Sequence, residues 1–185
     1  MNVIFLDFDG VIDTNYYKSY EQVEEKVKIL SYICHEYDCK VVIEASAKDA
    51  INEETLEVDK EATWVLKIFE LFKKYDIECI GRTPNVSKPN NDISEFPMWK
   101  EDEIILYLYR HPEIDHFCVI DDDDLTDTHK KSDLDKVRDH LVKTNDFLMD
   151  NPKDEGLQFY HKEKIGDILK LENNFKIQSL RKTIS

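Results

Sequence analysis

The sequence contains no apolar run long enough to cross a membrane, no CxxC pair and no tract rich in glycine and serine. A membrane-spanning helix needs ~20 consecutive apolar residues. Met1 leads directly into a short strand-like run instead of a basic segment followed by a long apolar one. We therefore expect neither a transmembrane segment nor a secretory signal, and we expect a cytoplasmic protein. The lack of linkers and repeats favours a single domain, which 185 residues suit.

Basic residues are outnumbered, since 25 Lys and Arg stand against 40 Asp and Glu and give a formal net charge of -15. Broad, non-specific nucleic-acid binding depends on clustered Lys and Arg, so this balance argues against it while leaving room for a local basic groove. Charged residues make up 35% of the chain, above the ~25% of ordinary soluble domains. The apolar runs still suffice for a core, which excludes a disordered chain.

Cysteines are few. The four are Cys34, Cys39, Cys79 and Cys118, and the last two lie inside apolar runs. This pattern predicts small core residues in a reducing compartment. A zinc site built from Cys34, His35 and Cys39 is an alternative, but its spacing is not that of a zinc ligand pair.

Short β-branched or aromatic runs alternate with stretches of helical period, which is typical of a parallel α/β sheet. Strands are predicted at about residues 2–7, 40–45, 77–80, 116–121 and 140–144. Helices are predicted at about residues 19–37, 50–74 with a break near Asp59, 98–110, 134–139 and 162–171. Prolines and asparagines in 81–97 predict a long loop. We expect a domain of residues 1–172 followed by a basic tail at 173–185.

Polar residues follow the predicted strands, and the strands of a parallel sheet end at one edge, where ligands bind. These residues are Asp7, Asp9 and Gly10 after the first strand, Ser46 after the second, and 121–124 after the fourth, with Lys100 near the start of the preceding helix. One carboxylate of the first pair can attack phosphorus while the other transfers a proton, and a glycine permits the turn between them. The simpler alternative is a pair of acids that cap a turn.

Four carboxylates at one edge are unfavourable unless a cation neutralises them. Hard oxygen ligands shared with a phosphate indicate Mg²⁺. Within the acidic run we expect Asp121 and Asp122 to be functional, and Asp123 and Asp124 to form a solvated turn.

These motifs resemble those of the haloacid dehalogenase-like (HAD) phosphohydrolases. The first family motif, an apolar strand ending in Asp-x-Asp-Gly, is matched by residues 3–12. The second, a strand ending in Ser or Thr, is matched by 41–46, and the fourth, a strand ending in paired acids, by 117–122. Lys100 is the best-placed residue for the third motif, a Lys or Arg at a helix start, with Lys88 and Lys48 as substitutes.

The chain more narrowly resembles the capless HAD domain of "Swiss Army Knife" RNA-repair proteins. The similarity is carried by residues 5–11, 81–84, 121–124, 141–144 and 156–157. Glu44-Ala45-Ser46-Ala47-Lys48 departs from the Ser-Ser-Ser-Trp-Arg usual in that family.

The resemblance implies a single Rossmann-like three-layer α/β domain, with a five-stranded parallel sheet in the order 3-2-1-4-5 and no folded cap. It implies Mg²⁺-dependent hydrolysis of a phosphomonoester through an aspartyl-phosphate. Asp7 would be the nucleophile and Asp9 the general acid and base, while Ser46 and Lys100 would hold the phosphoryl oxygens. The metal would lie among Asp7, the Asp9 carbonyl, Asp121 and Asp122. Gly10, Arg82 and Lys88 are the further substrate-binding candidates.

The expected partner is a phosphorylated substrate, either a small molecule or a nucleic-acid end, and no membrane. An uncovered crevice is compatible with a large substrate. Two alternatives stay open from the sequence. One is a phosphotransferase of the same fold that passes the phosphoryl group to an acceptor other than water. The other is a non-catalytic module that binds metal and phosphate.

Overall fold

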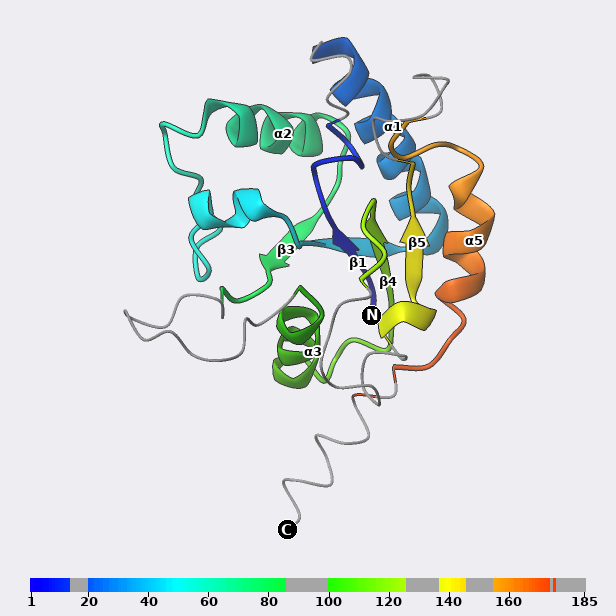
Figure 1. Ribbon diagram of the computed structural model, residues 1–185. Helices are drawn as coiled ribbons and strands as arrows, with labels where there is room; N and C mark the ends of the chain where they lie inside the picture. Colours follow the sequence, from blue (N-terminus) through cyan, green and yellow to red (C-terminus); the bar gives the residue numbers. More distant parts are fainter. Residues whose placement is uncertain (14–19, 86–99, 126–136, 146–154, 174, 176–185) are drawn as a thin grey trace.

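The computed structural model describes residues 1–13, 20–85, 100–125, 137–145, 155–173 and 175 (Figure 1). Five parallel strands form one sheet in the order β3-β2-β1-β4-β5, as predicted. They are β1 (Asn2–Leu6), β2 (Cys39–Ile43), β3 (Cys79–Arg82), β4 (His116–Asp121) and β5 (Leu141–Lys143). The helices are α1 (Tyr20–Tyr37), the 3₁₀ helix η1 (Ser46–Ala50), α2 (Thr63–Lys74), α3 (Lys100–Arg110) and α5 (His161–Ile168).

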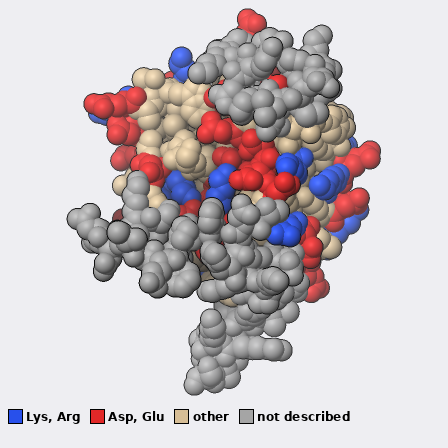
Figure 2. Space-filling view, in the orientation of Figure 1, with Lys and Arg blue, Asp and Glu red and all other residues tan. Residues whose placement is uncertain are grey.

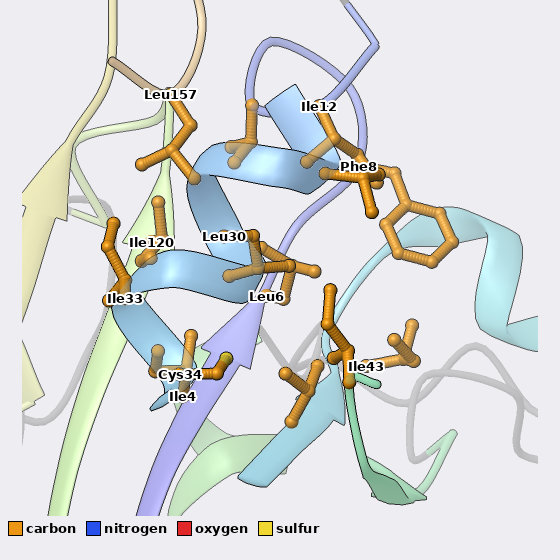
Figure 3. Packing of buried hydrophobic residues seen from close by; sticks show 14 of the residues in the cluster. Ile4, Leu6, Phe8, Ile12, Leu30, Ile33, Cys34, Ile43, Ile120 and Leu157 are labelled. Carbon is orange, nitrogen blue, oxygen red and sulfur yellow. The ribbon is translucent and has the colours of Figure 1, made fainter. Parts of the chain in front are cut away.

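The sheet is covered on both faces, which gives the three predicted layers (Figure 1). On one face, Leu6, Ile43 and Ile120 join a core with the buried residues of α1, α2 and α5, and Figure 3 shows Leu30 and Ile33 packed over them. On the other face, the alternate strand residues Phe5, Val42 and Val119 pack with the buried residues of α3. Successive strand residues point to opposite faces, so both faces bury apolar side chains. In the described part of the chain no second folded unit covers the sheet.

The helix predicted at 50–74 is wrong in its first half, because α2 begins only at Thr63. In the preceding segment, side-chain oxygens accept hydrogen bonds from nearby backbone N–H groups, which are then not available for helical hydrogen bonds. The Asn52 side chain accepts hydrogen bonds from the N–H groups of Glu54 and Thr55, and Asp59 accepts one from Glu61. Such local bonds compete with helical hydrogen bonding. Residues 51–62 therefore form turns and a single β-bridge, Ile51 with Val58.

The remaining differences from the predicted elements are small. β3 lies two residues later than predicted. Of the helix predicted at 134–139, residues 137–139 are helical and the others lie outside the described residues, as do residues 86–97 of the predicted loop. Asn173 and Phe175, at the start of the predicted tail, are buried. None of the described helices is both long and apolar enough to span a bilayer.

All four cysteines are free. Cys34, Cys39 and Cys118 are buried, which confirms their prediction as core residues, whereas Cys79 is half-buried. The zinc alternative finds no support. Among the described residues, the one group of three or more suitable metal ligands is composed of aspartates and contains neither cysteine nor histidine.

Candidate active site

The carboxyl edge of the sheet holds an acidic row. Leu6 of β1 is in register with Ile43 of β2 and Ile120 of β4, so the next residues are Asp7, Glu44 and Asp121. The backbone ladder continues into this row, since Asp7 N–H donates to Ile120 O at 3.0 Å and Glu44 N–H donates to Leu6 O at 2.8 Å. Leu6, Ile43 and Ile120 face α1, so strand alternation turns the three acids toward α3.

Lys100, the first residue of α3, meets two of these acids. Its Nζ lies 2.6 Å from Asp7 Oδ2 and 3.0 Å from Asp121 Oδ2. Both carboxylates are buried, at 4% and 0% exposure, while Lys100 is half-buried. The other oxygens accept backbone hydrogen bonds, Asp7 Oδ1 from Phe8 N–H at 2.7 Å and Asp121 Oδ1 from Asp123 N–H at 2.8 Å. The predicted neighbours Asp7, Asp121 and Lys100 are thus together, with fixed orientations.

A tight turn after β1 brings Asp122 beside this group. The carbonyl of Phe8 accepts hydrogen bonds from the next turn's N–H groups, those of Val11, Ile12 and Asp13, while the Phe8 ring packs on Trp64. Gly10 has a φ of +70°, which favours glycine. A Cβ at Gly10 would lie 2.7 Å from Asp122 Cβ and closer still to its carboxylate. Glycine is therefore required both by the turn and by the approach of Asp122.

Burial and mutual repulsion perturb the buried acids. Burial, followed by the charge of Asp121, raises the pKa of Asp7 to about 7, against the opposing effect of Lys100. Burial also raises the pKa of Asp121. For Lys100, burial alone would lower the pKa, but the carboxylates of Asp121 and Asp7 outweigh it and raise the pKa overall, so its ammonium stays charged.

The site fits a divalent cation. Asp7, Asp121 and Asp122 each offer an oxygen, and these atoms all lie within 4.8 Å of one another. Carboxylate oxygens are the ligands that Mg²⁺ prefers. Lys100 carries one positive charge against three acids, and its effect on Asp7 is smaller than the combined effect of burial and of the Asp121 charge, which raise the pKa of Asp7. A cation held by the three oxygens would relieve the remaining repulsion.

Asp9 and Ser46 face each other at the rim of the site. Asp9 is exposed, and its Oδ2 accepts a hydrogen bond of 3.4 Å from Ser46 Oγ, at the start of η1. The Asp9 carboxylate is outside the group of three that suits a metal. The predicted metal contact of Asp9 is through its carbonyl, a different atom from the one that meets Ser46.

Arg82 does not join the aspartates in the described structure. Its Nε donates to Ile51 O at 2.6 Å, its Nη1 donates to Thr83 O at 2.9 Å, and its Nη2 lies 3.6 Å from Glu53 Oε2. It lines a hollow of 790 Å³ formed mainly by residues 49–60. Lys88 lies outside the described residues.

Lys48, the other substitute for Lys100, is buried at 6% exposure in a polar cluster that the sequence reasoning missed. Its Nζ lies 3.1 Å from Glu44 Oε2, donates to Thr83 Oγ1 at 3.0 Å, and bonds to Glu103 Oε2. Thr83 Oγ1 also donates to Glu44 Oε2. Burial raises the pKa of Glu44 to about 7. A glutamate directly after the apolar run Val41-Val42-Ile43 was a usable signal. Glu103 lies in an acidic helix start, where nothing in the sequence marks it as buried.

Comparison with protein families matched residues 3–148 to the HAD domain in Swiss Army Knife RNA repair proteins. No curated protein and no solved structure matched the chain. The family match spans most of the chain and includes the whole acidic row together with Lys100.

Proposed function

The chain belongs to the family of HAD domains found in Swiss Army Knife RNA repair proteins, a phosphatase-type hydrolase superfamily, and from this premise we propose that it is a Mg²⁺-dependent phosphomonoesterase acting through an aspartyl-phosphate on Asp7. The observation that carries the proposal is the contact of the buried Asp7 carboxylate with half-buried Lys100, beside Asp121 and Asp122. A nucleophilic carboxylate needs a fixed orientation and nearby positive charge to receive an anionic phosphoryl group.

The reaction has two balanced steps. A carboxylate oxygen of Asp7 bonds to phosphorus as the bond from phosphorus to the ester oxygen breaks, and protonated Asp9 gives its proton to the departing oxygen. Water then bonds to phosphorus while Asp9 takes a proton from it, and the bond between Asp7 and phosphorus breaks. Inorganic phosphate leaves and Asp7 is restored. The exposure of Asp9 suits a group that meets both a leaving alcohol and water.

Cationic groups stabilise the phosphoryl oxygens in this scheme. Lys100 supplies a permanent charge at the start of α3, where the helix dipole is also favourable to anions. Ser46 supplies a hydroxyl from the start of η1. Mg²⁺ would be held by Asp7, the Asp9 carbonyl, Asp121 and Asp122, and when bound it supplies positive charge to the transferring phosphoryl group.

The substrate class we propose is a phosphorylated small molecule or a nucleic-acid end. Figure 2 shows acidic side chains gathered across the middle of the displayed face, next to a smaller number of Lys and Arg side chains. Such a surface repels polyanions at long range. Recognition would then depend on the phosphate itself, through Lys100 and the metal, more than on long-range attraction.

The test measures hydrolysis of a panel of phosphomonoesters, nucleotides, phosphopeptides and oligonucleotides phosphorylated at the 3′ or 5′ end. Asp7→Asn keeps the side-chain shape and should abolish turnover without loss of the fold, and Asp9→Asn should lose at least ~10²-fold. Asp76→Asn, at an exposed position next to His35, is the matched control and should be unaffected. Acid quenching of the wild type should trap labelled phosphate on the protein.

Three outcomes contradict the proposal. Wild-type turnover in Asp7→Asn would exclude this nucleophile. A loss of only a few-fold in Asp9→Asn would exclude it as the acid and base. A wild type that binds Mg²⁺ and phosphate but hydrolyses no member of the panel would indicate the non-catalytic module instead.

A further inference from the structure

The buried ammonium of Lys48 joins three segments of the chain. Lys48 belongs to η1, Glu44 follows β2, and Glu103 belongs to the first turn of α3. Its Nζ bonds to both carboxylates and to Thr83, which follows β3. All four residues are buried, with exposures between 0% and 6%. Thus one buried cation ties the start of α3 to the carboxyl ends of two strands.

Two features of this cluster exceed what packing requires. Apolar side chains of similar volume often stabilise a protein as well as a buried ion pair does, so a buried pair is weak evidence for a role in stability. In addition, Glu44 Oε1 is buried and has no hydrogen-bond partner among the residues that the structure describes. The desolvation of the buried ion pairs and of the buried Glu44 oxygen lowers stability, but the cluster fixes the positions of the segments that it joins.

Two of the segments that meet at Lys48 carry the proposed phosphate ligands, namely α3 with Lys100 and η1 with Ser46. Glu103 lies three residues after Lys100, and residues three apart occupy the same side of a helix. The first turn of α3 is thereby held at two points, by Lys100 on Asp7 and Asp121 and by Glu103 on Lys48. Lys48 also lies two residues after Ser46 in the same short helix.

We infer that Lys48 is a positioning residue for the proposed phosphatase reaction: through Glu103 it fixes the first turn of α3 and so holds Lys100 against Asp7. The inference rests on the proposed function for its catalytic consequence. Its structural content, the placement of Lys100, is testable without turnover. The hydrogen bonds and ion pairs of Lys48 to described residues are with Glu44, Thr83 and Glu103 and not with Asp7 or Asp9, so no catalytic contact is assigned to it.

The first measurement compares kcat and KM for a small aryl phosphate in the wild type, Lys48→Met and Glu103→Gln. A misplacement of ~1 Å costs ~10²-fold in rate, so we expect kcat to fall by about that factor in Lys48→Met, with a smaller change in KM. Glu103→Gln keeps the side-chain shape and should show a smaller loss in kcat. Lys40→Met, which removes a lysine paired with Glu78 at the surface, is the matched control and should behave as the wild type.

The second measurement needs no activity. The proteins are reductively methylated with formaldehyde and a borohydride for a limited time, and modification of Lys100 is quantified by peptide mass spectrometry. We expect the methylation rate of Lys100 to rise about tenfold in Lys48→Met and to rise in Glu103→Gln, as coupling within one ion-pair network allows. It should not change in Lys40→Met. Thermal unfolding identifies which variants are folded.

The outcomes separate the inference from the proposed function. If the wild type hydrolyses nothing, the proposed function fails, while methylation of Lys100 still tests the placement. If Lys100 is methylated at the wild-type rate in folded Lys48→Met, the inference is overturned even when kcat falls. Should Lys48→Met not fold, Glu103→Gln decides, and wild-type values for both its kcat and Lys100 reactivity overturn the inference.

Discussion

Replacing Gly10 by alanine should damage the proposed metal site more than it damages the fold. The substitution adds a Cβ at a φ of +70°. That Cβ would lie 2.7 Å from Asp122 Cβ and closer to the carboxylate, so the Asp122 side chain has to move. Asp122 is one of the three acids whose oxygens lie within 4.8 Å of one another. Its displacement removes or reorients one of the three proposed carboxylate ligands.

The two consequences have different magnitudes. Placing a non-glycine residue in the left-handed region costs ~1–2 kcal/mol of stability. Disturbing the groups that orient a metal ligand typically costs ~10–100-fold in metal affinity or activity. We therefore expect Gly10→Ala to lose about 1–2 kcal/mol in the free energy of unfolding without metal. The Mg²⁺ concentration for half-maximal phosphatase activity should rise by about one to two orders of magnitude.

Gly156 provides the control, because its φ of +67° imposes the same backbone cost on an alanine. Denaturant unfolding without metal should show similar losses of stability in Gly10→Ala and Gly156→Ala. Titration of activity with Mg²⁺ should then separate the variants, with a raised requirement only in Gly10→Ala. Equal Mg²⁺ requirements in both variants and the wild type would refute the role of Gly10 in seating Asp122.

Two further predictions concern the acids. Asp122→Asn should raise the Mg²⁺ concentration that activity requires, whereas Asp124→Asn should not, because Asp124 is exposed and paired with Lys143 at 2.7 Å. Activity is measured in EDTA and then during titration with Mg²⁺. An equal rise in the Mg²⁺ requirement of both variants would indicate diffuse cation binding. Burial raises the pKa of Glu44 from 4.5 to about 7, so unfolding releases its proton between these pH values and stability falls as pH rises through them. Glu44→Gln should reduce this loss in the free energy of unfolding between pH 4.5 and 7 by ~3 kcal/mol. Denaturant unfolding at a series of pH values measures it. The same dependence of stability on pH in the variant and the wild type would contradict the prediction.

The parallel sheet could be predicted from the alternation of strand-like and helical periods, and its strand order and three layers from the resemblance to HAD domains. The helix at 50–74 was predicted too long, because the apolar residues at helical spacing all lie within α2, whereas side chains compete for the backbone in the segment before it. The hydrogen bonds made by Asn52 and Asp59 stabilise turns there. Asn52 and Asp59 are residues typical of turns, but from the sequence we predicted only a break near Asp59 within one helix.

The proposed site was predictable where it lies within one motif. Asp7, Asp9 and Gly10 lie within four consecutive residues, and Asp121 and Asp122 end an apolar strand. The sequence left three lysines as candidates for the third motif, because the choice among them depends on where α3 packs. The structure distinguishes Lys100 from Lys48 by their partners. Lys100 contacts Asp7 and Asp121, whereas Lys48 is paired with Glu44 and Glu103.

Sheet register explains why a single helix can serve both the site and the buried cluster. Leu6 and Ile43 are aligned across β1 and β2, and Leu6 and Ile120 across β1 and β4. Each is followed by an acid, so all three acids lie on the face of α3, where Lys100 reaches two of them and Glu103 reaches the third through Lys48. A slip of one residue in either pairing would turn its acid toward the core of α1 and α2. The two charged clusters therefore depend on the same alignment of three apolar strands, which no single motif specifies.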